Sequence, residues 1–518
     1  MTVARTRCIA LVGVTGHLVE VEADIGAGMA GLHLIGMLDT ALSEARDRVR
    51  SALVNSRCAW PDTRITVSLF PASLPKRGSM FDVAIAVALL AAAGVVPVTK
   101  VAEPFFLGEL GLDGTIRPVR GVLPAVLAAV AAGARTVVVP VRNAAEAALV
   151  PDVTVVPVAS LSRLTSWLRG DAPAAEWPAL AGESASGGRP PLSPARSAGV
   201  VPDLGDVAGQ PLARRALEVC AAGGHNLWML GPPGTGKTML AERLPTLLPD
   251  LEPDQALEVT AIHSVAGALP GDRPLLSCPP FVAPHHTATV ASVIGGGSGA
   301  IRPGAVSLAH RGVLFLDEAP EFPMTVLDAL RQPLESGQVV ISRALGSITF
   351  PARFMLVLAA NRCPCARPAT PDDPCGCSPA ARRRYLSRLS GPLLDRVDVK
   401  VTLYRSTRRE LLADRRFIEP SRVVAERVLL ARERAAKRFA HTPWRCNAEI
   451  PTGALHGEYR PARSAMSPLL RHLDTGRLSA RGLDRVLRLA WTLADLGGKD
   501  RPEIQETTSA LGLWLGED

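Results

Sequence analysis

Near its middle the chain reads Gly231-Pro232-Pro233-Gly234-Thr235-Gly236-Lys237-Thr238. An apolar run over residues 226–230 predicts a strand before this loop, and residues 239–248 predict a helix after it. Strand, glycine-rich loop and helix in this order are the context that a Walker A P-loop requires. In such a loop, backbone N–H groups surround phosphates and the helix N-terminus adds positive potential. We therefore expect these eight residues to bind ATP, with Lys237 on the β- and γ-phosphates and Thr238 on Mg²⁺.

Two other apolar runs end in polar residues. Residues 313–316 end at Asp317 and Glu318, and residues 354–360 end at Asn361. The carboxyl ends of parallel strands meet at one edge of a sheet, where a P-loop also lies. We expect Asp317 to hold Mg²⁺, Glu318 to polarise the attacking water and Asn361 to position that water. The alternative for each is an ordinary turn residue, but a position directly after a buried strand favours the catalytic interpretation.

Composition divides the chain of 518 residues into four parts. Residues 1–168 alternate short β-rich runs with Ala/Leu-rich helices, which predicts an α/β domain. Residues 169–202 are rich in Gly, Ser, Pro and Ala and predict a flexible linker. Residues 203–402 alternate strand and helix around the nucleotide motifs, and residues 403–518 are helical and rich in arginine.

The net charge and the lengths of the apolar runs indicate in which compartment the protein works and what kind of partner it can bind. A formal net charge of +8 permits a polyanionic partner but is mild for this length. The apolar run at 9–14 is too short for a signal peptide, and the run at 83–98 is shorter than the roughly 18 residues of a membrane span. We expect a cytoplasmic protein with no membrane association. Its nine cysteines should then be thiols or metal ligands rather than disulfides.

Several long motifs resemble one known family. They are Ala-Leu-Ser-Glu-Ala-Arg-Asp-Arg-Val-Arg at 41–50, Pro-Ala-Ser-Leu-Pro-Lys-Arg-Gly at 71–78, Pro-His-His-Thr at 284–287, Leu-Asp-Glu-Ala-Pro-Glu-Phe at 316–322 and Ser-Gly-Pro-Leu-Leu-Asp-Arg-Val-Asp at 390–398. On these motifs the chain resembles, over nearly all of its length, the magnesium-chelatase-like AAA+ ATPases of the ComM/YifB type. The resemblance implies an AAA+ core, a helical lid, and a homo-hexameric ring that moves on DNA, with branch migration or helicase-type remodelling as its activity.

The resemblance also implies roles for two arginines and for one loop. Arg396 matches an arginine finger, which reaches the γ-phosphate bound by a neighbouring subunit, and Arg481 matches a sensor-2 arginine at the start of a lid helix. The alternative for either arginine is a surface ion pair. Residues 285–304 match the loop-forming insert of the subgroup, and residues 338–350 predict a β-hairpin. In a ring both would project toward the pore; otherwise they are ordinary surface loops.

Residues 1–168 resemble the fold of the Lon protease domain without its catalytic residues. The Lon serine would fall at Met80 and the Lon lysine at Leu123. Ser79 lies next to the expected position, but it would still lack a lysine base. We therefore expect a non-catalytic binding or assembly module.

Four cysteines form a CxC–x9–CxC pattern between residues 363 and 377. Thiolates of Cys363, Cys365, Cys375 and Cys377 could close a tetrahedral zinc site. The one-residue spacing is less usual than CxxC, but the segment is rich in Pro, Asp and Gly and has no apolar core of its own. The resembling family also has cysteines here. Free thiols or a redox pair are the alternatives.

The leading hypothesis is an ATP-driven motor that acts on single-stranded or branched DNA. An ATP-dependent protease is disfavoured by Met80 and Leu123. An ATPase subunit of a metal-chelatase complex and a protein remodeller remain open. The fused N-terminal domain, and the lack of an acidic integrin-like domain on this chain, favour DNA.

Overall fold

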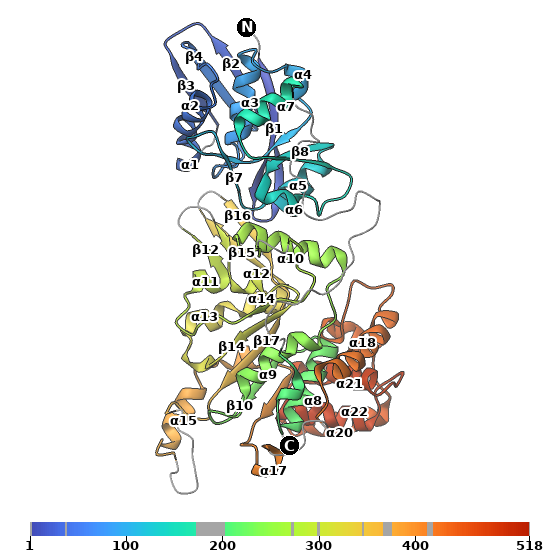
Figure 1. Ribbon diagram of the computed structural model, residues 1–518. Coiled ribbons are helices and arrows are strands. Elements are labelled where there is room, and N and C mark those ends of the chain that lie inside the picture. The colour runs from blue at the N-terminus through green and yellow to red at the C-terminus, as the bar shows by residue number, and fades with distance from the viewer. Residues whose placement is uncertain are drawn as a thin grey trace.

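The computed structural model describes most of the chain (Figure 1). The described residues are 3–36, 39–171, 202–270, 274–297, 301–343, 346–365, 375–411 and 418–516. The predicted linker at 169–202 lies almost wholly outside them, and so do residues within the glycine-rich tip of the insert and at the tip of the predicted hairpin. Among the described residues no helix is long and apolar enough to cross a membrane.

The N-terminal domain is built on a seven-stranded sheet (Figure 1). Its strands are β1 Ala4–Val12, β2 Thr15–Gly26, β3 Gly31–Ile35, β4 Arg64–Phe70, β5 Phe105–Phe106, β8 Thr136–Pro140 and β9 Thr154–Val158. The order across the sheet is β3-β4-β2-β1-β5-β8-β9. The β1–β2 and β2–β4 pairs are antiparallel and the other pairs are parallel. A separate ribbon joins β6 Glu109–Leu110 to β7 Ile116–Arg117.

Helices pack on this sheet with a common core. They are α1 Thr40–Ser43, α2 Ala45–Asn55, α3 Asp82–Ala92, α4 Val98–Val101, α5 Val122–Ala131, α6 Ala144–Ala147 and α7 Leu161–Arg169. The apolar run at 83–98 becomes α3, and ten of its eleven residues are buried. The helix is apolar on every side because it lies inside the domain rather than on its surface.

The central domain contains a five-stranded sheet in which every pair is parallel. Its strands are β10 Leu227–Leu230, β11 Phe281–Val282, β14 Val313–Leu316, β17 Met355–Ala360 and β18 Val399–Thr402, in the order β11-β14-β17-β10-β18. The central strands are apolar along their whole length because helices cover both faces of a parallel sheet. All four residues of β14 and all six of β17 are buried.

The helices of the central domain are mostly short. They are α8 Pro211–Gly223, α9 Lys237–Arg243, α10 Pro253–Ala266, α11 Val290–Ile294, α12 Ala305–Leu308, α13 Met324–Ala329, α14 Arg331–Ser336, α15 Pro379–Leu386 and α16 Gly391–Leu394. The helix expected over 239–248 is shorter than predicted, because α9 ends at Arg243 and a 3₁₀ turn, η4 Leu244–Leu247, follows it. Pro245 has no N–H for the next α-helical hydrogen bond, which accounts for the change.

Two antiparallel ribbons lie in the regions expected to carry loops. The insert forms β12 Gly295–Gly296 and β13 Arg302–Pro303, and the predicted hairpin forms β15 Gln338–Arg343 and β16 Gly346–Pro351. Phe350 is fully buried, and Val14 of the β1–β2 turn packs in the same apolar cluster as Ile348. One face of the hairpin therefore lies against the N-terminal domain of the same chain.

The C-terminal domain is helical (Figure 1). Its helices are α17 Arg408–Leu411, α18 Ser421–Arg438, α19 Thr452–His456, α20 Arg463–Asp474, α21 Ala480–Leu496 and α22 Ile504–Leu515. α18 and α21 pack on α8, and α22 packs on β18. Asp398, directly before β18, accepts hydrogen bonds from Asn226 N at 3.1 Å and from Arg485 of α21 at 2.9 Å. The lid is thereby attached to the amino-terminal ends of the strands.

The N-terminal and central domains also meet through a polar joint. α10 packs against α5, and Gly121 N donates to Ser264 O at 3.2 Å. The buried carboxylate of Glu146 accepts from Leu123 N at 2.8 Å and from the Ser264 hydroxyl. One side chain thus joins α5, α6 and α10.

Candidate functional site

The glycine-rich loop lies between β10 and α9, at the carboxyl end of the strand. Gly231 N donates to Ala360 O at 3.2 Å, which ties the start of the loop to the end of β17. Gly234 and Gly236 have φ values of +76° and +87°. Only glycine adopts this left-handed conformation without strain, so the loop can bend back toward the helix N-terminus.

Lys237 is buried inside this loop. Its ammonium donates to Gly231 O and Pro232 O, each at 2.9 Å, and to Asn361 Oδ1 at 3.0 Å. These contacts use all three of its N–H donors. Burial lowers the pKa of Lys237, and the charges of Asp317 and Glu318 oppose that effect. The contact with Asn361 joins two residues that are 124 positions apart in the chain.

Thr238 and Asp317 place two oxygen ligands side by side. The Thr238 hydroxyl donates to Asp317 Oδ2 at 2.6 Å, and Asp317 Oδ1 accepts from Glu318 N at 2.9 Å. Hydroxyl and carboxylate oxygens are the ligand types that Mg²⁺ takes, usually together with phosphates and water. These residues therefore fit a magnesium nucleotide.

Glu318 stands beside the same edge in an unusual conformation. Its φ is +50°, which is uncommon for a residue other than glycine. Its carboxylate Oε2 lies 3.3 Å from His286 Nδ1, and the two side chains are 45% and 33% exposed. Solvent therefore reaches Glu318, as a residue that acts on water requires.

His286 is a residue of the site that has no predicted role from the sequence. The available signal is the Pro-His-His-Thr run at 284–287, which carries the family resemblance and overlaps the start of the insert. The His285 and His286 rings lie 4.1 Å apart between centroids, and His285 Nδ1 lies 2.9 Å from Thr287 Oγ1. The run is thus a locally ordered turn that brings one histidine to Glu318.

Arg396 and Arg481 lie away from the P-loop of their own chain. Arg396 precedes β18, so it lies toward the opposite edge of the sheet. Its side chain is only 10% exposed and donates to Pro392 O and to Glu335. Arg481 is exposed on the first turn of α21. Within the described residues no contact joins either arginine to the P-loop.

The four clustered cysteines come together. Their sulfur atoms all lie within 4.8 Å of one another. Three separations are 3.1 Å for Cys363–Cys365, 3.4 Å for Cys365–Cys375 and 3.3 Å for Cys363–Cys375. A tetrahedral Zn–S₄ centre with bonds of about 2.3 Å needs sulfurs about 3.8 Å apart. The donor set therefore fits zinc with small adjustments.

The positions that correspond to the Lon catalytic pair lie in the apolar core of the N-terminal domain. Met80 is 8% exposed and Leu123 is fully buried. The Ser79 hydroxyl donates to Glu109, and no lysine contacts it among the described residues. Lys76 is fully buried and its ammonium donates to Pro71 O.

A parallel sheet with a P-loop after one strand and carboxylates after another defines the class of P-loop nucleotide-binding proteins. Family models agree over most of the chain. The model for subunit ChlI of Mg-chelatase matches residues 21–143, that for magnesium chelatase subunit ChlI matches 203–411, and that for its C-terminal part matches 418–513.

Three relatives match nearly the full length of the chain. A protein of Mycobacterium tuberculosis is 52% identical over 511 residues, which are 99% of this chain and 98% of that protein. YifB of Escherichia coli is 39% identical over 515 residues, or 98% and 96% of the two chains. Competence protein ComM of Haemophilus influenzae is 40% identical over 517 residues, or 99% and 97%. The chain belongs to the ComM/YifB family of magnesium-chelatase-like AAA+ proteins.

Proposed function

We propose that this chain hydrolyses Mg-ATP and, as a homo-hexameric ring, uses the energy to remodel DNA by branch migration or helicase-type movement. The observation that carries the ATPase part is the set of contacts between separate motifs. Lys237 bonds Asn361 and Thr238 bonds Asp317 at one edge of the sheet. Such convergence is what positioning of a phosphoryl group and its metal requires.

Each residue of the site has a distinct role in this proposal. Lys237 exchanges its loop carbonyls for the β- and γ-phosphates, and Thr238 and Asp317 hold Mg²⁺. Glu318 orients and polarises the attacking water, with Asn361 beside it. Arg396 acts on the nucleotide of a neighbouring subunit, where a cation meets the charge that develops in the transition state, and Arg481 serves as the sensor-2 arginine of the lid.

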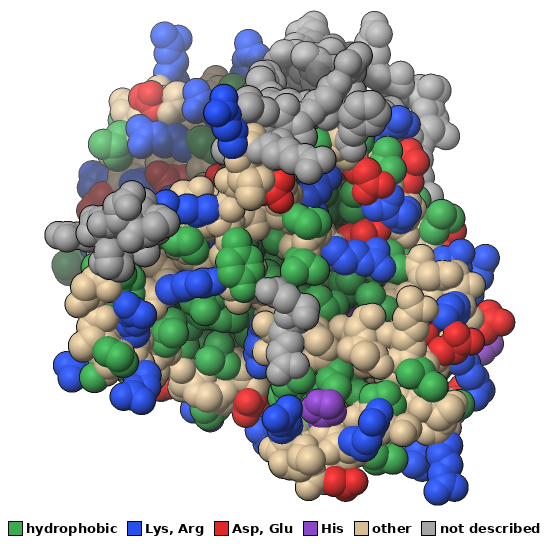
Figure 2. Space-filling view, turned by 90° about the horizontal axis from the view of Figure 1, so that it is seen from below, with side chains coloured by type: hydrophobic (Ala, Val, Ile, Leu, Met, Phe, Trp, Pro, Cys, Tyr) green, Lys and Arg blue, Asp and Glu red, His purple; other side chains and the backbone are tan. Residues whose placement is uncertain are grey.

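The name of one relative and the charge of this chain support DNA as the partner. One relative carries the name competence protein, and this chain has a net charge of +8. Figure 2 shows one face of the molecule on which Lys and Arg side chains are spread around a central region of hydrophobic ones. A positively charged surface attracts nucleic acid with an affinity that falls with salt.

A second candidate is an ATPase subunit of a chelatase-like complex. The descriptions of the matching family models favour it, because they name subunit ChlI of magnesium chelatase. Both candidates use the same ATPase site, so the site geometry does not separate them.

A substrate panel tests the proposal. ATP turnover of the purified chain would be measured alone, with single-stranded DNA, with a four-way DNA junction and with casein. We expect DNA to raise turnover and the effect to weaken between about 50 and 200 mM salt. Turnover that only casein stimulates, or that nothing stimulates, would contradict the DNA motor.

We also infer that Cys363, Cys365, Cys375 and Cys377 hold one structural zinc. The support is the mutual approach of the four sulfurs within 4.8 Å. A closed Cys₄ set is typical of structural rather than catalytic zinc. The site follows β17 and precedes α15, so it would stabilise the segment after Asn361.

A further inference from the structure

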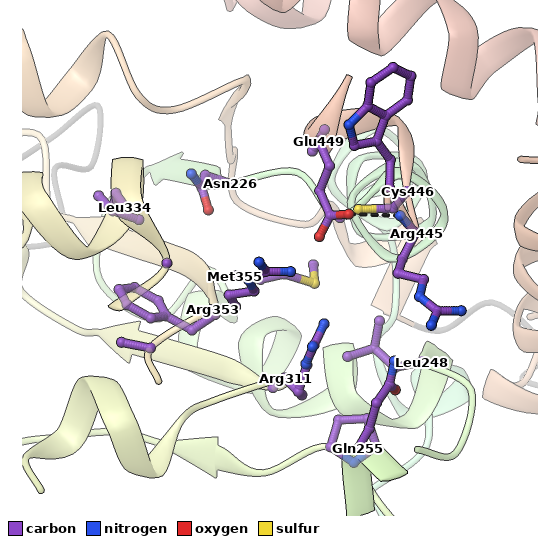
Figure 3. Close-up of a pocket in the computed structure, with 18 of the residues that line it drawn as sticks. Asn226, Leu248, Gln255, Arg311, Leu334, Arg353, Met355, Arg445, Cys446 and Glu449 are labelled. Carbon is purple, nitrogen blue, oxygen red and sulfur yellow. Dashed lines mark hydrogen bonds between the residues drawn. The ribbon is translucent and has the colours of Figure 1, made fainter. Parts of the chain in front are cut away.

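A cavity of about 590 Å³ lies between the central domain and the lid (Figure 3). Asn226, Gly312 and Met355, which line it, stand at or just before the amino-terminal ends of β10, β14 and β17. The P-loop follows the carboxyl end of β10. The cavity is therefore at the opposite edge of the sheet from the nucleotide site.

The charges that line this cavity are unequal. Its lining includes six arginines and four carboxylates: Arg311, Arg353, Arg432, Arg445, Arg485 and Arg488, with Asp250, Glu335, Asp398 and Glu449. Two of the carboxylates already have cationic partners. Asp398 pairs with Arg485 at 2.9 Å, and Glu335 pairs with Arg396, which is outside the cavity. The lining of the cavity therefore carries an excess of positive charge.

Two of the arginines are half-buried and have no carboxylate bonded to them among the described residues. Arg432 Nε donates to Ala221 O and Arg488 Nε donates to Ile450 O, each at 2.8 Å. Burial lowers the pKa of both guanidinium groups, which the nearby acidic groups do not offset. An anion in the cavity would offset the free-energy cost of taking these two charges out of water.

Further arginines approach from both walls. In Figure 3, Arg311 and Arg353 of the central domain and Arg445 of the lid surround the same space. Arg311 is 3.4 Å from Glu258, whereas no ion pair engages Arg353 or Arg445 within the described part of the chain. Arg353 and Arg445 are both exposed, so a ligand can reach them from solvent.

We propose that this cavity binds a phosphate-bearing ligand of up to nucleotide size, such as a nucleotide or an inorganic polyphosphate. The planar guanidinium fork matches phosphate oxygens in a bidentate geometry. Cavities that take such ligands measure about 300–1,000 Å³, which includes the volume found here. Apolar side chains of Leu248, Met355 and Trp444 supply the low-polarity walls that strengthen these charge interactions.

The two walls belong to different domains, so the ligand would hold the lid against the central domain. Arg353 stands before β17, and Arg445 stands in the loop between α18 and α19. A phosphate group between them attracts both. Such binding requires neither ATP hydrolysis nor DNA.

Binding of inorganic tripolyphosphate to the full chain tests the proposal. Calorimetry would use the Lys237→Ala protein, in which the P-loop is disabled. We expect saturable binding of one tripolyphosphate per chain. Adding Arg353→Ala and Arg445→Ala should weaken it by about 10- to 100-fold, the range for lost hydrogen bonds between charged groups.

Arg163→Ala is the matched control, because Arg163 is an exposed arginine on α7 of the N-terminal domain. It should leave binding unchanged. Circular dichroism would verify that each variant is folded, and each single substitution would be measured as well as the pair. Binding by ADP in the same variants distinguishes a nucleotide from a simple polyphosphate.

Absence of saturable tripolyphosphate and ADP binding would overturn the proposal. So would binding that persists unchanged in the Arg353→Ala, Arg445→Ala protein. If only DNA binding depended on these two arginines, the cavity would be part of a DNA surface and the assignment to a small phosphate ligand would be wrong.

Discussion

Lys237 and Glu318 occupy different places in the nucleotide site and should fail in different ways. Lys237 is the buried cation of the loop, whereas Glu318 is half exposed and acts when water attacks. We expect Lys237→Ala to lose nucleotide affinity. Glu318→Gln should bind nucleotide normally and lose about 10²–10⁴ in turnover, the usual contribution of a general base. Nucleotide titration and steady-state turnover measure the two effects, and a Glu318→Gln protein with wild-type turnover would refute the assignment.

His286 should act through Glu318. The Glu318 backbone is in a sparsely populated conformation, and His286 is the side chain in contact with its carboxylate. We expect His286→Ala to lower kcat by about tenfold and leave nucleotide affinity unchanged, because a displaced base costs rate rather than binding. His441→Ala, an exposed histidine of the lid, is the control. Equal losses of kcat and affinity would instead indicate a general structural role.

At the level of elements, the cysteine cluster should behave as one metal-binding unit. The four sulfurs lie within 4.8 Å of one another, which is suited to a single ion. Metal analysis of protein purified without chelator should find about one zinc per chain. Cys375→Ser should abolish it, whereas Cys58→Ser in the N-terminal domain should not. Four freely titratable native thiols without zinc would rule out the site.

The joint between β18 and α21 should be sensitive to pH. Burial alone would raise the pKa of Asp398, but Arg485 and His225 hold it well below the ordinary carboxyl value. A depressed native pKa means that the stabilisation is full above the unfolded pKa of about 4 and is lost as pH falls toward the native value. Asp398→Asn should therefore cost about 3 kcal/mol near neutral pH, the lower end for a buried pair, because Arg485 is 23% exposed.

Denaturation of wild-type and Asp398→Asn protein between pH 7 and pH 2 checks this expectation. The difference between the two should shrink as pH falls below about 4. Asp474→Asn, an exposed aspartate at the end of α20 in the same lid, should show no difference at any pH. A difference for Asp398→Asn that stays constant over the whole range would contradict the role of the charge.

At the scale of the whole molecule, ATP hydrolysis should require an assembled ring. Arg396 is held near the far edge of the sheet and cannot serve its own P-loop. We expect Arg396→Ala to bind ATP and to turn over about 10³–10⁵ times more slowly, as for loss of other arginine fingers. Mixing it with Lys237→Ala protein should restore part of the activity, because some sites then combine an intact P-loop with an intact neighbouring finger.

The arrangement also sets a condition on assembly. Arg396 is bonded to Glu335 and Pro392 O in the single chain, so it must leave these partners to reach a neighbour. Arg463→Ala, an exposed lid arginine, should leave turnover unchanged. Dilute monomer that hydrolyses ATP as fast per chain as the ring, or mutants that never complement, would show that Arg396 does not act between subunits.

The sequence by itself determined the strands and the glycine-rich loop that form the nucleotide site. β10, β14 and β17 appear where apolar runs predicted them, each within one residue at its start, and the hairpin of β15 and β16 lies where it was expected. These features follow from short-range periodicity and from the turn chemistry of glycine. The alternation of strand-like and helix-like runs predicted the α/β fold class, and motif resemblance predicted the family; the family models and the relatives confirm both. The helix predicted over 239–248 instead ends at Arg243, because Pro245 has no N–H for the next α-helical hydrogen bond.

Only the tertiary structure decided which distant residues meet. It places His286 beside Glu318 and pairs Glu335 with Arg396. It also joins Ser264 of the central domain to Glu146 of the N-terminal domain through a hydrogen bond. It also leaves Arg432 and Arg488 half-buried, with no carboxylate bonded to either among the described residues. The physical reason is that the burial and pairing of side chains depend on how helices and strands pack together. Hydrophobic periodicity and composition do not specify that packing.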